Sequence, residues 1–142
     1  MLREVTLALP MIPEMEIEAS KTATAIAESI RMSPDRIDEV RMAVIEACIN
    51  AFEHSRASDQ EVFVTFEVVG ELGDNDPQKL RITVRDHGVG FSPDAIPEPV
   101  IQEKLKSVTK RGWGLSIIRG LMDEVEIRSG ADGTTVVMSK MR

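Results

Sequence analysis

Cysteine and histidine are scarce in this 142-residue chain, and their scarcity excludes two kinds of site. The one cysteine, Cys48, cannot form an intrachain disulfide, which fits a reducing compartment. One cysteine and two histidines also cannot build a Cys/His metal cluster. We therefore expect neither a disulfide framework nor a metal site of that type.

Long apolar runs and an excess of positive charge are lacking too. No apolar stretch approaches the roughly 20 residues that cross a bilayer, and the N-terminus carries an acid early and lacks a signal-peptide core. The net charge is -7, which argues against non-specific binding to nucleic acid or to anionic membranes. We expect a cytoplasmic protein, although a nucleotide would need only a local site.

What the chain does contain is typical of one globular domain. Hydrophobic residues make up 42% and charged residues 29%, and there is no internal repeat or low-complexity segment. A chain of this length is long enough to bury a substantial core. We therefore treat residues 1–142 as a single domain.

Residue patterns divide the chain into eight expected elements. The expected strands cover 2–9, 61–69, 80–85, 124–129 and 134–140, and the expected helices cover 15–32, 34–54 and 112–123. In helix 15–32 the residues at helical spacing are Ile17, Ala23, Ile26 and Ile30. Ser33 suits the N-cap of the second helix and Pro34 its first position. Short turns between consecutive strands predict an α+β fold of two layers, with an antiparallel or mixed sheet and helices on one face.

Helix 34–54 has an apolar face and a polar stripe. The apolar face carries Ile37, Val44, Cys48 and Ala51. Glu46, Asn50 and Glu53 fall roughly opposite. One interpretation is a solvated face. The other is chemical: Glu46 polarises a water or hydroxyl, and Asn50 holds Mg²⁺ through its side-chain oxygen.

Two glycine motifs provide the rest of a candidate site. Asp86-His87-Gly88-Val89-Gly90 follows a strand, and the Asp carboxylate can accept a hydrogen bond from an amino group such as that of adenine. Gly112-Trp113-Gly114 opens a helix, whose N-terminus favours phosphate. Between them, residues 92–111 have little regular pattern and are interpreted as a lid or as a surface excursion. Lys110 and Arg111 add positive charge beside Gly112.

Four motifs stand in order along the chain: Glu46-x-x-x-Asn50, Asp86-x-Gly88-x-Gly90, Gly112-x-Gly114-Leu115 and Gly133-Thr134. In this arrangement the chain resembles the GHKL ATPase/kinase superfamily, whose nucleotide pocket is the Bergerat fold, a two-layer sandwich with a mixed, mostly antiparallel sheet. The length, the helix around Glu46 and the short lid are most similar to the anti-sigma-factor serine/threonine kinases of bacterial partner-switching systems. The resemblance covers nearly the whole chain.

The resemblance implies a role for each motif residue and two cofactors, ATP and Mg²⁺. Glu46 is the implied general base and Asn50 the Mg²⁺ ligand. Asp86 would bind the adenine amino group, and Thr134 would lie near adenine. The remaining nucleotide-binding residues implied by the motifs are Gly88, Gly90, Lys110, Arg111, Gly112, Gly114 and Leu115.

The implied function is transfer of the ATP γ-phosphate to a serine of an anti-anti-sigma (STAS-type) antagonist, together with sequestration of a sigma factor. Relatives commonly dimerise, so a homodimer is expected. The alternative is a non-catalytic, nucleotide-dependent protein that regulates a partner. A histidine kinase would need a phospho-accepting helical hairpin and a gyrase-like ATPase a large transducer domain, and the chain contains neither. The sequence leaves the roles of His87 and Trp113 and the identity of the partners open.

Overall fold

The computed structural model describes residues 4–54, 61–70, 79–86, 114–130 and 133–142. Its labelled elements are β1 (Glu4–Pro10), α1 (Met15–Ser29), α2 (Pro34–His54), β2 (Glu61–Val69), β3 (Lys79–Arg85), β4 (Glu124–Gly130) and β5 (Gly133–Met141). A further helix covers residues 114–121. The order of strands and helices expected from the sequence is therefore confirmed. The expected lid at 92–111 lies outside the described residues.

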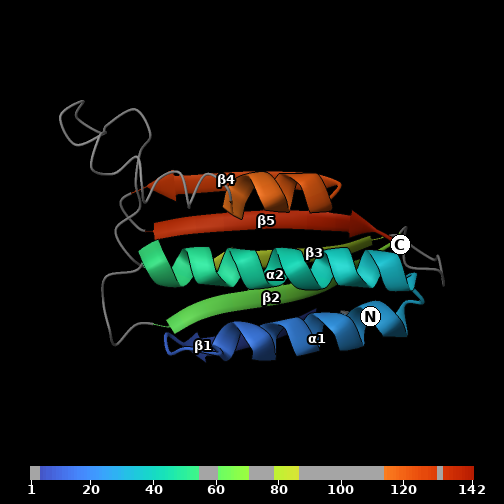
Figure 1. The fold of residues 1–142 in the computed structure, drawn as a ribbon, viewed down its shortest axis with the longest axis horizontal. Coiled ribbons are helices and arrows are strands. Elements are labelled where there is room, and N and C mark those ends of the chain that lie inside the picture. Colours follow the sequence, from blue (N-terminus) through green and yellow to red (C-terminus); the bar gives the residue numbers. More distant parts are fainter. Residues whose placement is uncertain (1–3, 55–60, 71–78, 87–113, 131–132) are drawn as a thin grey trace.

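The strands form one sheet in the order β1-β2-β3-β5-β4. Every pairing in it is antiparallel, so the sheet is not mixed in the described part of the chain. Figure 1 shows α1, α2 and the orange helix 114–121 on one face of this sheet. The fold is thus α+β with two layers, as the sequence predicted.

Alternation of apolar and polar residues gives the sheet one buried face. In β3, Leu80, Ile82 and Val84 are at most 1% exposed, whereas Arg85 is exposed on the other face. The register places Val84 between Val64 of β2 and Val136 of β5. Burying such apolar side chains contributes roughly 25 cal/mol per Å² removed from water. The helices cover this face because it carries most of the large apolar side chains of the sheet.

Small residues form much of the buried face of α1. Ala19, Ala23 and Ala27 are fully buried. Of the residues at helical spacing, Ala23 and Ile30 are buried, whereas Ile17 is 43% exposed. Alanines let α1 and α2 approach each other closely, and a bulky residue in that seam would hold them apart.

The buried face of α2 is wider than expected. Val44, Cys48 and Ala51 of the expected face are at most 5% exposed, so that expectation is confirmed for them. Ala43 and Ala47 are fully buried, and Asn50 on the same side of the helix is only 6% exposed. The interpretation of Asn50 as part of a solvated stripe opposite the core was therefore wrong. The expected face omitted Ala43 and Ala47, which extend it toward Asn50.

The connection between α1 and α2 ends the first helix earlier than expected. Arg31 adopts a left-handed conformation with φ 62°, and the amide of Met32 donates to the carbonyl of Ala27 at 3.1 Å. This closes the helix end after Ser29 instead of at residue 32. The Ser33 hydroxyl then accepts from the amide of Arg36 at 3.4 Å, which confirms the expected start of α2.

None of the helices that the structure describes combines the length and the apolar character needed to cross a membrane.

Cys48 lies in the core. It is fully buried on α2, and burial raises the pKa of its thiol to about 12, with a smaller contribution from the negative charge of Glu16. The protein therefore keeps this thiol protonated and poorly nucleophilic at neutral pH.

Replacing Arg31 tests the strained helix end. We expect Arg31→Gly to raise the free energy of unfolding by about 0.5–1 kcal/mol, because glycine has no Cβ to oppose positive φ. Urea denaturation measures this. Arg31→Ala is the control, because it removes the same charge but keeps a Cβ. Equal stabilisation by both substitutions would contradict the conformational explanation.

The thiol of Cys48 predicts a pH dependence of stability. Between the ordinary pKa of 9.0 and the folded pKa of about 12, the unfolded chain loses the thiol proton while the folded chain keeps it. The free energy of unfolding should therefore fall as pH rises through this window. Denaturation at several pH values, compared with Cys48→Ala, isolates the effect. The same slope in both proteins would show that Cys48 does not cause it.

Candidate functional site

Helix α2 positions the first two candidate residues. Glu46 is partly buried, and Asn50, one helical turn further on, is 6% exposed. No hydrogen-bond partner among the described residues accompanies the Asn50 side chain. Buried amides are normally hydrogen-bonded, so the Asn50 amide is suited to bind a ligand.

The start of helix 114–121 meets α2 at Glu46. Gly114 is buried, and a Cβ added there would lie 3.4 Å from Oε2 of Glu46. The structure thus brings together two residues that are far apart in the sequence. The first amides of a helix have no partner within the helix and favour negative charge. Leu115, the next predicted residue, is half-buried beside them.

Asp86 and Thr134 form a second buried pair, at one end of β3 and β5. They are 3% and 4% exposed. The Thr134 amide donates to Oδ1 of Asp86 at 3.2 Å, and the Asp86 amide donates to the Thr134 carbonyl at 3.0 Å. These bonds fix the Asp86 carboxylate in a position where it can accept a hydrogen bond from an amino group.

Two further residues contact this pair. Gly133 belongs to the predicted Gly133-Thr134 motif, whereas Ser129 was not predicted. The hydroxyls of Ser129 and Thr134 lie 2.9 Å apart across β4 and β5. Gly133 has φ 120°, and a Cβ there would clash with the carbonyl oxygen of Asp86. Alternation along β4 is the sequence signal that could have found Ser129, because it places this residue on the inward face.

A surface hollow of about 270 Å³ adjoins this pair. Among the described residues it is lined by Arg85, Asp86, Arg128, Ser129, Gly130, Gly133 and Thr135. Neither Glu46 nor Asn50 is among them. The hollow therefore lies at the Asp86 end of the sheet and does not reach the α2 end of the candidate site.

The other predicted residues lie outside the described part of the chain: Gly88, Gly90, Lys110, Arg111 and Gly112, together with His87 and Trp113. Their predicted roles stay predictions.

The described residues fit a weakly coordinated Mg²⁺. They contain no group of three or more His, Cys, Asp or Glu arranged to hold a metal ion. Mg²⁺ commonly takes one or two oxygen ligands from the protein and completes its coordination with water and phosphates. The buried Asn50 amide is suited to supply such a ligand.

The contact between Gly133 and Asp86 predicts that position 133 does not tolerate a side chain. We expect Gly133→Ala to lower the free energy of unfolding by about 2 kcal/mol or more, because the new methyl would clash with the Asp86 carbonyl and the backbone would be strained. Gly130→Ala is a matched control, since nothing lies within 4 Å of a Cβ there. Chemical denaturation compares them, and equal losses would contradict the contact.

Comparison with known proteins identifies the family of the chain. The family model described as "Histidine kinase-like ATPase domain" matches residues 10–140. The anti-sigma F factor of Oceanobacillus iheyensis is 31% identical over 142 residues, and that of Bacillus cytotoxicus is 30% identical. Each of these alignments covers 99% of this chain and 93% of the relative.

Solved structures show the same fold. A Mycobacterium tuberculosis structure with RsbU and RsbW domains superposes with a TM-score of 0.69 at 20% identity, over 97% of this chain and 32% of that one. The SiaB-SiaC complex from Pseudomonas aeruginosa superposes with a TM-score of 0.59 at 9% identity, over 99% and 89%. With the family match over residues 10–140 and the two relatives aligned over nearly their full length, the chain belongs to the histidine kinase-like (GHKL) ATPase domain family and is similar to its anti-sigma factors.

Proposed function

We propose that this protein is an anti-sigma factor of a partner-switching system that acts as an ATP- and Mg²⁺-dependent serine/threonine kinase. Its substrate would be a serine on an anti-anti-sigma, STAS-type antagonist, and its other partner a sigma factor. The relatives named anti-sigma F factor support the regulatory class. The observation that carries the kinase assignment is the Glu46 carboxylate against the start of helix 114–121, one turn from Asn50.

At the nucleobase end, this chain supplies fixed hydrogen-bonding groups. The buried Asp86 carboxylate would accept a hydrogen bond from the adenine amino group. The Thr134 amide and hydroxyl hold that end in place through Asp86 and Ser129. Recognition by a buried carboxylate disfavours a base without an amino group, because the carboxylate would then lose a partner.

At the phosphate end, positioning and charge stabilisation are the main requirements of phosphoryl transfer. The amides of Gly114 and Leu115 would donate to phosphate oxygens at the helix start. Mg²⁺, held through the Asn50 oxygen, would neutralise charge on the phosphates. Glu46 would accept the proton of the substrate hydroxyl as that oxygen bonds to the γ-phosphorus, and the bond from the γ-phosphorus to the ADP oxygen would break.

The homodimer expected from the resemblance stays a prediction, as does the cytoplasmic location.

Replacing Glu46 tests the general base. We expect Glu46→Gln to reduce transfer of labelled γ-phosphate to a STAS-type antagonist by about 10²–10⁴-fold, because the amide cannot take the hydroxyl proton. ATP affinity, measured by calorimetry, should be largely retained. Asp38→Asn is the control, since Asp38 is an exposed carboxylate on the same helix.

The remaining outcomes are distinct. ATP binding with no transfer to any antagonist encoded beside this protein would favour the nucleotide-dependent binding protein over the kinase. Absence of ATP binding would contradict the whole site. Unchanged transfer by Glu46→Gln would remove Glu46 from the role of base.

A further inference from the structure

Lys140 is a buried cation outside the candidate site, near the end of β5. Its side chain is 7% exposed. Its Nζ donates to Oε2 of Glu39 on α2 at 2.6 Å and to the carbonyl of Leu121 at 2.6 Å, and it lies 4.0 Å from Oδ1 of Asp123. One ammonium group therefore joins β5, α2 and the end of helix 114–121.

The chemistry of these contacts makes them specific. Burying an ammonium group is unfavourable unless charged and polar partners replace its water. The Leu121 carbonyl is among the last of its helix and has no partner within that helix. A cation at this end also interacts favourably with the helix dipole. Lys140 thus donates a hydrogen bond to a carbonyl at the end of helix 114–121, and the Glu39 carboxylate neutralises the charge of Lys140.

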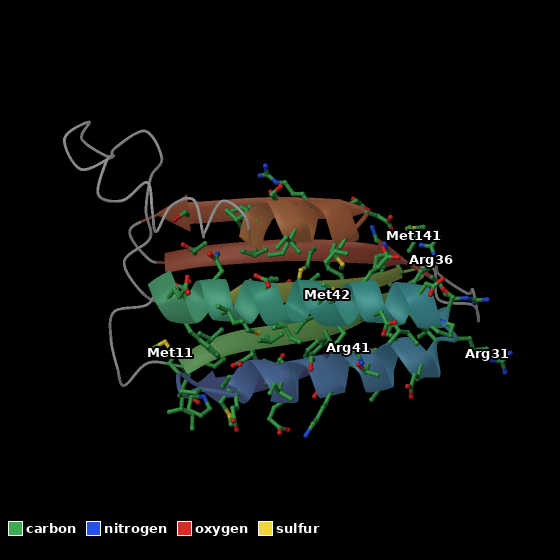
Figure 2. The ribbon with its side chains drawn as sticks, in the orientation of Figure 1. Met11, Arg31, Arg36, Arg41, Met42 and Met141 are labelled. Carbon is green, nitrogen blue, oxygen red and sulfur yellow. The ribbon has the colours of Figure 1, made fainter. Side chains whose placement is uncertain are left out.

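A second set of contacts joins α2 to the end of β5 beside Lys140. Arg36 of α2 donates to the Met141 carbonyl at 3.1 Å, and the Met141 amide donates to Oδ2 of Asp123 at 2.6 Å. Figure 2 shows Arg36 beside Met141 near the C-terminus. The N-terminal half of α2 is therefore tied to the end of β5 by more than one bond.

The contacts of Lys140 lie at the same distance from the candidate site along both helices. Glu39 precedes Glu46 by seven residues on α2, and Leu121 follows Gly114 by seven residues on the other helix. At a rise of about 1.5 Å per residue, Glu39 and Glu46 are about 10 Å apart along α2, and Gly114 and Leu121 are about 10 Å apart along their helix. The two helices run in opposite directions on the same face of the sheet (Figure 1). They are therefore joined at Lys140 and meet again, over a matched length, at Glu46 and Gly114.

We propose that Lys140 is a positioning residue for phosphoryl transfer, which fixes the separation of Glu46 from the amides of Gly114 and Leu115 by holding α2 and helix 114–121 together at their far ends. This inference rests on the proposed function. It concerns only the phosphate end of the site. Asp86 and Thr134 are held by their own hydrogen bonds at the opposite end of β5, so the nucleobase end does not depend on Lys140.

Lys140→Met, which keeps the length of the side chain but removes the charge, is the test. A displacement of about 1 Å at a reacting group lowers the rate by about 10²-fold, so we expect phosphotransfer to fall by about 10- to 100-fold. Calorimetric affinity for adenosine should stay within about twofold, because adenosine uses only the Asp86 end. Lys140→Arg should recover most of the transfer rate.

Lys79→Met is the matched control. Lys79 contacts Glu124 at 3.2 Å and pairs across the sheet with Met141. It precedes the buried Leu80 on β3, so its side chain lies on the sheet face opposite the helices. It should leave transfer and adenosine binding unchanged. A rate loss in this variant equal to that of Lys140→Met would assign the effect to general loss of charge and overturn the proposal.

The other outcomes separate the two proposals. Failure of the unaltered protein to bind ATP would overturn the proposed function and this inference with it. Normal transfer by folded Lys140→Met, or equal losses of adenosine and ATP affinity, would overturn only this inference. Should Lys140→Met not fold, Glu39→Gln replaces it, since Glu39 is 38% exposed in its side chain. It should slow transfer and spare adenosine binding, and unchanged transfer would overturn the positioning role.

Discussion

The close packing of α2 is the constraint on which the candidate site depends. Ala43, Ala47 and Ala51 are at most 5% exposed, and the helix contacts α1 as well as β2, β3 and β5. Interiors packed at native density accept little extra volume, so the size of these side chains sets how near α2 lies to its neighbours. Glu46 and Asn50 are positioned by that distance, because both lie on the flank of the alanine face.

Strand β5 contributes to the nucleobase end of the candidate site near its start and to the contacts of Lys140 near its end. Near its start, Thr134 holds the Asp86 carboxylate through a backbone amide. Near its end, Lys140 holds α2 and helix 114–121. Asp86 and Lys140 are the buried charged residues in the described part of the chain. The Asp86 carboxylate accepts from a backbone amide, and Lys140 donates to a backbone carbonyl and to the Glu39 carboxylate. Such partners are the condition for burying a charge without large loss of stability.

Much of the fold was predictable from local patterns. Alternation in β2 and β3 and the Ser33-Pro34 start of α2 each depend on neighbouring residues, and all were confirmed. The apolar face of α2 was predictable in part, because Val44, Cys48 and Ala51 are buried as expected. Its full width was not predictable, because Ala43 and Ala47 have weak hydrophobicity and give a faint periodic signal. Spacing alone also did not separate Ile17, which is exposed, from Ala23 and Ile30, which are buried.

The order of elements, the two-layer class and the residue types of the site follow from residue patterns, because periodicity and turn chemistry are local properties. Which of those residues meet depends on how the elements pack. Glu46 and Gly114 are 68 positions apart, and their contact exists because two helices lie on one sheet face. The roles of Gly133 and Lys140 also appear only in space. A clash with Asp86 and a bond to the Leu121 carbonyl both join segments that are distant in the chain.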